Sequence, residues 1–185
     1  MLTCRDERGL QRDALADYKT AAPVFMDMVH HMIHAGKTFI ATHYDADTDI
    51  AGPLYLRFTA PTTKEAHLTF EVNADGAGTV EFFETPTEDD PAVPGDAVSA
   101  INPHRGSSNT AEATVKSDPV FTDDGTLLWR ERVGVAGNPA QSEGGSGGSR
   151  HEFIVEDGTV YALKFTADAD NTKVWVAFNW YEIDE

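Results

Sequence analysis

Nine short segments with the residue pattern of β-strands follow one another from residue 37 to residue 183. In each, β-branched and aromatic residues nearly alternate with polar ones, and polar or glycine-rich stretches separate the segments. The segments are 37–44, 53–59, 66–72, 78–84, 111–117, 126–133, 151–155, 159–166 and 172–183. No helical pattern alternates with them, which disfavours a parallel sheet with crossover helices. The sequence therefore predicts a mainly β fold, a single antiparallel β-sandwich of the jelly-roll kind.

The turns between these segments suggest local pairings. In segment 66–72, Leu68, Phe70 and Val72 share one face while polar residues occupy the other, as expected of a half-buried antiparallel strand. The connection NADGAG that follows contains an Asp-Gly pair typical of tight hairpins. It predicts that segments 66–72 and 78–84 are hydrogen-bonded neighbours. Two further Asp-Gly turns are expected at 124–125 and 157–158.

The N-terminal region has a different pattern. Phe25, Met28, Val29, Met32 and Ile33 recur at three- and four-residue intervals and a glycine follows at position 36, which predicts a short helix, with an extended arm as the alternative. A further short helix is expected within residues 5–19. The predicted organisation is an N-terminal arm or helical segment over residues 1–35 and a β-sandwich domain over residues 36–185.

Two stretches interrupt the strand pattern. Residues 85–98 contain three prolines and four carboxylates without periodicity, and they predict a surface loop. Residues 134–150 are rich in Gly and Ser and could form a flexible linker. We interpret them as a loop of the fold, because strand segments of similar character flank them on both sides.

The charge of the chain excludes several classes of partner. Lys and Arg number 14 and Asp and Glu number 31, for a formal net charge of −17. Such a chain repels nucleic-acid phosphates and anionic membrane surfaces, and it has no run of about 18 apolar residues that could cross a bilayer. We expect neither a nucleic acid nor a membrane as partner. Cys4 cannot form an internal disulfide, and no secretory signal is evident, which fits synthesis in a reducing cytosol.

A histidine cluster is the best candidate for a metal site. His30, His31 and His34 lie close together, and a helix would place His30 and His34 on one face at a spacing that can hold a metal. The segment HHMIH lacks the glutamate of a zinc hydrolase motif, and no cysteine or carboxylate in register completes the ligand set. We therefore expect no metal or other cofactor. These histidines would instead bind the backbone, or lie at a subunit contact or trimer axis.

Other residues that could support catalysis form no complete motif. Asp45, Asp47 and Asp49 resemble a calcium loop, but Ile50 occupies the position that requires glycine. A glycosidase pair such as Glu81 with Glu84 can be chosen, but nothing distinguishes it from other carboxylate pairs. Phosphate-binding loops and nucleophile elbows are absent from the sequence. An enzymatic function is therefore not predicted.

Three tryptophans have two possible roles. Trp129, Trp175 and Trp180 could line a sugar-binding platform, or they could pack in the core. Alternation in the last strand segment places Trp175 on one face and Trp180 on the other. At least one tryptophan is therefore expected to be buried.

The order of motifs along the chain resembles that of small virion proteins of tailed bacteriophages. These motifs read HHMIHAGKTF, AHLTFEVNADGAGTVEFFETPT, NPHR, DDGTLL, GGSGGSRHEFIVEDGTVYALKF and WVAFNWYE, and the resemblance covers about residues 29–182. The positions that match are His30, His34 and Gly36, then Asn102 and Arg105, then Arg150 and Glu152, and finally Tyr161 and Leu163. NPHR departs from the Asn-Arg-Asn-Arg more usual in the group, which puts a shared contact of that patch in doubt.

The resemblance implies a non-enzymatic structural role. It suggests a capsid decoration or cement protein on the virion surface, made in the host cytoplasm, whose partners are the major capsid protein and further copies of itself, with a trimer favoured. The candidate subunit or capsid contacts are His30, His34, Asn102, Arg105, Arg150 and Glu152. Arg105 and Arg150 would pair with carboxylates, such as Glu152 across a subunit boundary or within one chain.

Two other functional hypotheses remain. One is a carbohydrate-binding or tail or adaptor module used in host attachment. The other is a metal-dependent enzyme that uses the N-terminal histidine cluster.

Overall fold

The computed structural model describes residues 3–5, 11–13, 28–88, 95–134 and 152–184. One helix lies within these residues, α1 (Met28–His34). The long strands are β3 (Thr38–Thr48), β4 (Leu54–Thr59), β5 (Lys64–Ala74), β6 (Gly78–Glu84), β11 (Thr126–Val133), β13 (Val160–Ala167) and β14 (Thr172–Asp184). The short strands are β1 (Thr3–Arg5), β2 (Gln11–Asp13), β7 (Thr87–Glu88), β8 (Asp96–Val98), β9 (Thr114–Ser117), β10 (Phe121–Asp123) and β12 (Phe153–Val155).

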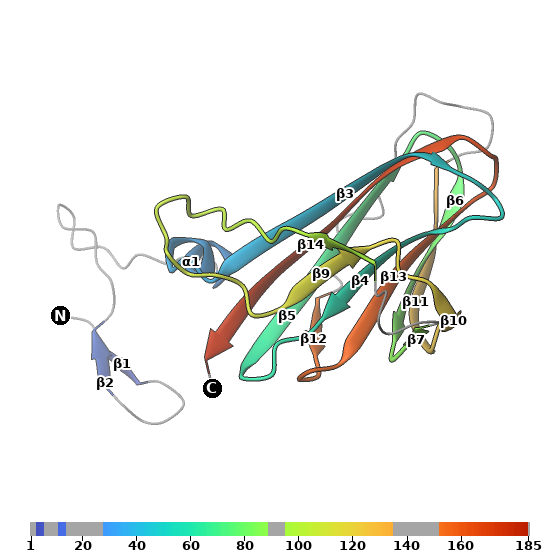
Figure 1. Ribbon diagram of the computed structural model, residues 1–185. Coiled ribbons are helices and arrows are strands. Elements are labelled where there is room, and N and C mark those ends of the chain that lie inside the picture. The colour runs from blue at the N-terminus through green and yellow to red at the C-terminus, as the bar shows by residue number, and fades with distance from the viewer. Residues whose placement is uncertain (1–2, 6–10, 14–27, 89–94, 135–151, 185) are drawn as a thin grey trace.

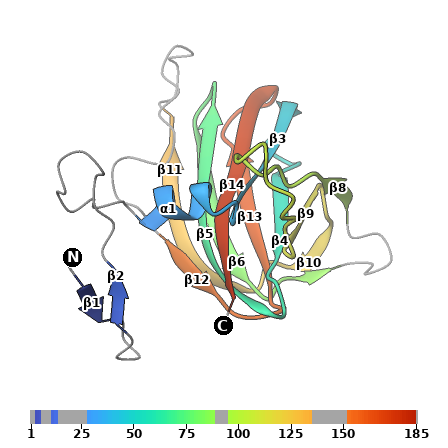
Figure 2. The ribbon, with the colours of Figure 1, turned by 90° about the vertical axis from the view of Figure 1, so that its left-hand side faces the viewer.

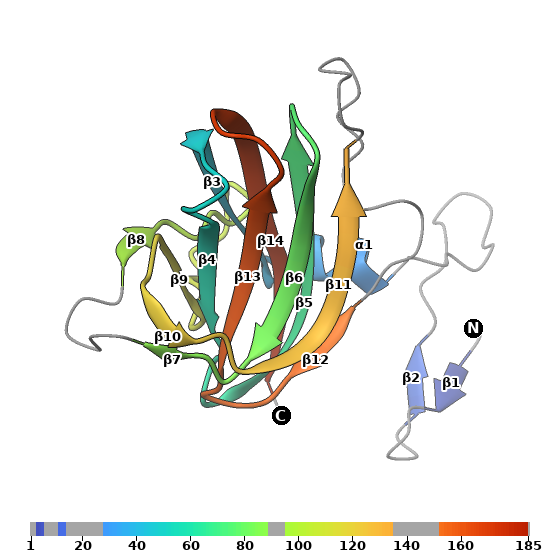
Figure 3. The same cartoon turned by 90° about the vertical axis from the view of Figure 1, so that its right-hand side faces the viewer.

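Two antiparallel sheets form the body of the protein. One has six strands in the order β11-β6-β13-β4-β9-β8, and the other has four in the order β12-β5-β14-β3. Figure 1 and Figure 3 show the two sheets as layers that face each other. Two pairs of short strands, β1 with β2 and β7 with β10, lie outside these sheets. The predicted mainly β, antiparallel sandwich is confirmed.

The pairing of the long strands gives a jelly-roll topology. The pairs are β3 with β14, β4 with β13, β5 with β12 and β6 with β11, so each strand from the first half pairs with its mirror counterpart in the second half. The chain is therefore one long hairpin, bent so that successive sections lie in alternate sheets. Pairing of β14 with β5 and of β13 with β6 joins the sections side by side. This is the two-sheet, Greek-key arrangement of a jelly roll.

The core lies between the two sheets and is rich in aromatic rings. Phe58 from the six-stranded sheet is fully buried and contacts Phe178 and Trp180 of the other sheet, with ring centroids 5.5 and 5.4 Å away. Phe70, which is partly buried, packs against Phe82 at 5.1 Å. Burial of each such side chain contributes about 1.5–3 kcal/mol to folding. Trp180 is buried as the alternation in its strand predicts.

The predicted hairpin between segments 66–72 and 78–84 is wrong. The first segment lies in β5 of the four-stranded sheet and the second in β6 of the six-stranded sheet. The backbone N of Asp75 donates to the carbonyl of Lys173, and the N of Asp168 donates to the carbonyl of Ala77. The connection thus passes from one sheet to the other alongside the β13–β14 connection. The Asp-Gly pair marked a turn correctly, but it did not indicate which strands pair.

The N-terminal predictions are partly confirmed. Residues 28–34 form a helix, so an extended arm is wrong for them, and the carbonyls of Met32 and Ile33 accept hydrogen bonds from Lys37 and Gly36 in a C-terminal capping motif. The helix expected within residues 5–19 is wrong at Gln11–Asp13, which form β2 and pair with β1. The rest of that prediction lies outside the described residues, as does most of the glycine-rich stretch 134–150.

All nine predicted strand segments are present as strands. The additional ones, β1, β2, β7, β8 and β10, have two or three residues each. β12 is equally short, but it was found as part of the longer predicted segment 151–155. Two of them, β7 and β8, lie in the predicted surface loop 85–98, of which residues 89–94 are outside the described part. The loop prediction is therefore wrong for the residues that form these two short strands.

Candidate functional site

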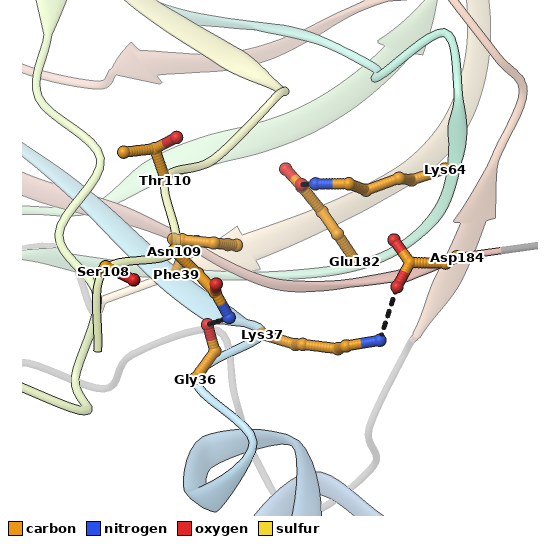
Figure 4. A pocket seen from close by; sticks show the side chains of 9 residues that line it. All are labelled: Gly36, Lys37, Phe39, Lys64, Ser108, Asn109, Thr110, Glu182 and Asp184. Atoms are coloured by element: carbon orange, nitrogen blue, oxygen red, sulfur yellow. Dashed lines mark hydrogen bonds and ion pairs between the residues drawn. The ribbon is translucent and has the colours of Figure 1, made fainter.

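A pocket of about 370 Å³ opens where the end of α1, the end of β14 and the long segment before β9 meet. Figure 2 shows α1 beside the four-stranded sheet, and Figure 4 shows the pocket from close by. Its lining residues are Gly36, Lys37, Phe39, Lys64, Ser108, Asn109, Thr110, Glu182 and Asp184. They come from segments far apart in the sequence, which only the folded chain brings together.

Two lysine–carboxylate pairs line this pocket. Lys37 Nζ lies 2.8 Å from Asp184 Oδ2, and Lys64 Nζ lies 3.0 Å from Glu182 Oε2 (Figure 4). Burial alone would lower the pKa of Lys64, but the hydrogen bond to Glu182 and nearby carboxylates outweigh it, so this pKa is raised. The hydrogen bond from Lys37 lowers the pKa of Asp184. Lys64 and Asp184 are therefore firmly charged at neutral pH, which suits binding of a polar group better than proton transfer.

Glu182 is the most constrained carboxylate of the pocket. Its side chain is 1% exposed, and it accepts hydrogen bonds from Trp180 Nε1 at 3.1 Å and from the backbone N of Glu112 and of Ala113 at 2.9 and 3.0 Å. With Lys64, these donors compensate the desolvation of a buried charge. Glu182 thereby ties β14 to the segment that leads into β9.

Glu112 holds the neighbouring turn. Its carboxylate accepts hydrogen bonds from the backbone N and the hydroxyl of both Thr62 and Thr63, at 2.6–3.1 Å. The Thr63 hydroxyl makes the largest contribution to lowering the pKa of Glu112, which falls to about 2. The carboxylate is therefore ionised throughout the neutral range.

The pKa of Glu112 predicts a dependence of stability on acid pH. Because the folded-state pKa is depressed, the stabilisation is fully present above the ordinary value of 4.5 and is lost as pH falls towards about 2. Glu112→Gln is expected to unfold at a lower temperature than the wild type at pH 6, with a smaller difference at pH 2.5. Thermal unfolding followed by circular dichroism across this range measures it. A difference that is constant with pH would contradict the assignment.

A hydrogen-bonded clasp brings two of the matched motifs together. The Asn102 side chain donates to the carbonyl of Gly36 at 2.8 Å, and Asn109 donates to the same carbonyl at 3.2 Å. A reciprocal backbone pair between Ile40 and Ile101 continues the contact along β3. Gly36 and Asn102, 66 positions apart, therefore act together within one chain. The clasp holds the segment before β9 against the α1–β3 corner.

Gly36 is required at the clasp for two separate reasons. Its φ is +68°, a left-handed conformation that costs a non-glycine residue about 1–2 kcal/mol. A Cβ at this position would also lie 2.3 Å from Ser107 Oγ. Gly36→Ala is therefore expected to destabilise the fold by more than the conformational cost alone, as measured by denaturant unfolding.

A second substitution separates the two reasons. Ser107→Gly in the Gly36→Ala background removes the clash but leaves the backbone strain, so it should restore only part of the lost stability. Full recovery of the free energy of unfolding would show that the left-handed φ of residue 36 costs nothing here. No recovery would show that the clash with Ser107 is not a cause of the lost stability.

Arg105 and Glu152 make contacts within the chain. Arg105 is exposed and donates to the carbonyl of Asn102 at 3.4 Å, and no carboxylate of the described residues pairs with it within the chain. A pairing across a subunit boundary stays a prediction. Glu152 accepts from the Tyr181 hydroxyl at 2.5 Å, and its carboxylate lies 3.0 Å from His67 Nδ1. Its partners are thus a tyrosine and a histidine of the same chain. Arg150, the other half of that motif, lies outside the described residues.

The remaining matched residues are buried in the six-stranded sheet. Tyr161 and Leu163 in β13 are buried. The Tyr161 hydroxyl donates to Glu84 and accepts from the backbone N of Glu156, and burial raises the pKa of Tyr161 to about 12. Glu84 therefore serves as its hydrogen-bond acceptor, while Glu81 pairs with Arg130. These two carboxylates have separate structural partners.

The histidine cluster separates into a pair and a single residue. His30 and His34 are exposed on α1 and their Nε2 atoms lie 3.0 Å apart. Among the residues whose structure is described, no group of three or more His, Cys, Asp or Glu side chains could hold a metal. His31 therefore does not join the pair as a third ligand.

The acidic segment 45–49 covers the end of β3 and the residue after it, and its aspartates accept hydrogen bonds from their own chain. Asp45 accepts from the backbone N of Asp47 and from the Thr48 hydroxyl, and Asp49 accepts from the N of Asn171. Asp45 and Asp47 thus belong to the end of β3, where the register with β14 shifts, and the turn favoured for them is wrong.

Comparison of the chain with models of known protein families, with curated protein sequences and with solved structures gave no match. In the described part of the chain, no helix has the length and hydrophobicity needed to span a bilayer.

Glu182 and its lysine partner were not identified from the sequence. A usable signal was present, because the alternation that places Phe178 and Trp180 inward places Glu182 inward as well. A carboxylate in an inward position requires partners, and their identity depends on the tertiary structure.

Proposed function

We propose that this chain is a non-enzymatic structural protein of a tailed-bacteriophage virion, a decoration or cement protein that binds the head shell as a homo-oligomer. The observation that carries the proposal is that the matched motif residues hold the fold together. Gly36 and Asn102 form the clasp, while Glu152 and Tyr161 make hydrogen bonds that hold strands in place. Proteins that share a structural role are expected to share the residues that maintain their fold. Jelly rolls also recur in viral capsid proteins, although fold alone does not determine function.

The charge and chemistry of the chain support the same proposal. A net charge of −17 suits an outward-facing surface, away from packaged DNA. The pKa shifts of Lys64 and Asp184 keep both side chains of the pocket charged at neutral pH. A pocket of this kind can position a polar group of a partner protein.

One side of the sandwich offers a surface for subunit contacts. Figure 2 and Figure 3 place β11 and β12 along the same side, and each pairs with one neighbour in its sheet. Leu127 and Leu128 on β11 and Ile154 on β12 are 41%, 39% and 64% exposed. Strand edges and exposed apolar side chains are features that associating proteins use.

Mass spectrometry of purified particles tests the proposal. Particles banded by density are expected to contain this chain at a constant ratio to the major capsid protein, and particles stripped of it should rebind the purified chain. Leu128→Lys combined with Ile154→Lys should weaken self-association and rebinding. Val120→Lys, at a position 61% exposed, is the matched control and should leave both unchanged. Particles without the chain would refute the proposal.

A carbohydrate-binding function is the second candidate, and one feature of the sheet favours it. Trp175 is the register partner of both Tyr44 and Asn73, so the three side chains form a row across the outer face of the four-stranded sheet. Tyr44 is 56% exposed and Trp175 is half-buried. Aromatic faces beside amide groups are a common means of binding sugars.

A glycan array distinguishes the two candidates. Binding that is lost in Tyr44→Ala and in Trp175→Ala, but retained in Trp129→Ala, would favour the carbohydrate-binding function. Absence of binding to any glycan would exclude it and leave the decoration proposal unaffected.

A further inference from the structure

His30 and His34 lie in an arrangement that their roles in the fold do not explain. Both side chains are exposed on α1, one helical turn apart, and neither contributes to the core. Their Nε2 atoms are 3.0 Å apart, and the rings meet edge to face with centroids 4.7 Å apart. Two ring nitrogens therefore lie close together at the protein surface.

The distance between the two nitrogens fits a shared metal ion. Two nitrogens 3.0 Å apart that each lie about 2.1 Å from one ion subtend an angle of about 90° at that ion. An angle near 90° is that of adjacent ligands in tetragonal or octahedral coordination, which Cu(II) and Ni(II) adopt with imidazole ligands. Tetrahedral zinc would need a wider separation. The separation is therefore compatible with two adjacent ligands of one ion.

We propose that His30 and His34 form a bidentate surface site for a divalent transition-metal ion, with Ni(II) or Cu(II) preferred. Within the described residues no third His, Cys, Asp or Glu completes the set, so the proposed site uses these two imidazoles and leaves the remaining positions to water or other ligands. Metal binding replaces one hydrogen bond between exposed groups, which water-exposed side chains lose at little cost. The net charge of −17 raises the local concentration of cations around the chain. This site is independent of the proposed function.

Calorimetric titration of the intact, untagged chain with nickel chloride at pH 7.5 tests the site. One ion per chain is expected to bind. His30→Ala and His34→Ala should each weaken binding at least tenfold, because a single imidazole remains. His31→Ala is the matched control, since His31 is exposed on the same helix but outside the pair, and it should bind nickel as the wild type does.

A spectroscopic measurement distinguishes the histidine pair from carboxylates elsewhere on the acidic surface. With one equivalent of Cu(II), electron paramagnetic resonance should show coupling to two imidazole nitrogens in the wild type and to no more than one in either variant. Equal loss in His31→Ala, or unchanged binding in the His30→Ala, His34→Ala double variant, would overturn the proposal.

Discussion

Replacement of Glu182 by alanine is expected to lower the free energy of unfolding by about 3–5 kcal/mol, the range measured when one member of a buried ion pair is removed. The carboxylate is 1% exposed and accepts hydrogen bonds from Lys64, from Trp180 Nε1 and from two backbone N–H groups. Its loss leaves the indole and both backbone donors buried without an acceptor, which adds to the loss of the ion pair. Urea unfolding of the purified chain measures the effect.

Asp184→Ala is the matched control for this prediction. Asp184 lies two residues further along β14, lines the same pocket and also pairs with a lysine, but its side chain is 66% exposed. Water can replace the aspartate at Lys37, so its removal should change stability much less than removal of Glu182. Glu182→Gln should fall between the two, because one acceptor oxygen remains. Equal effects of the two alanine substitutions would contradict the role assigned to burial.

Phe58→Ala is expected to destabilise the protein by about 3–5 kcal/mol, as is typical of large-to-small substitution at a buried phenylalanine. Phe58 is fully buried, and its ring contacts Phe178 and Trp180 of the facing sheet. Its removal therefore leaves a cavity at the contact between the two layers. Thermal and urea unfolding measure the loss.

Two variants test whether the cavity is the cause. Val120→Ala removes apolar atoms from a side chain that is 61% exposed, so it should stay within about 0.5 kcal/mol of the wild type. Phe58→Leu refills part of the space and should recover part of the stability. If Phe58→Leu were as destabilising as Phe58→Ala, the loss would come from the ring contacts rather than from the lost volume.

The strands and their buried faces could be predicted because they depend on a local property. Side chains alternate with a period of two, so the pattern in the last strand places Phe178 and Trp180 inward whichever strands lie beside it. The same alternation located each of the nine predicted segments. It failed for β7, β8 and β10, which have two or three residues and lie outside any longer alternating segment, whereas the equally short β12 lies within segment 151–155.

Strand pairing could not be predicted in this way. The Asp-Gly pair after residue 74 predicted that β5 and β6 are neighbours, yet they lie in different sheets. A turn determines where the chain changes direction, but the choice between pairing and crossing depends on packing against distant strands. Here the backbone of Asp75 pairs with Lys173, about a hundred positions away.

In the candidate sites, too, some features could be predicted from the sequence and others depend on the tertiary structure. The spacing of His30 and His34 followed from helical periodicity, and the structure adds that their nitrogens lie 3.0 Å apart while His31 remains outside the pair. The pocket pairs of Lys37 with Asp184 and of Lys64 with Glu182 had no sequence signal, because each joins residues over a hundred positions apart.

The sequence by itself determined that the protein is an acidic, mainly β sandwich, and which residues share a face in segments 66–72 and 172–183. Charge is a sum over residues, and side-chain alternation is a property of each strand, so both can be read without knowledge of distant contacts. Only the tertiary structure decided the mirror pairing of strands, the clasp of Asn102 on Gly36 and the burial of Glu182. Those features depend on which distant segments meet, and packing of the two sheets selects them.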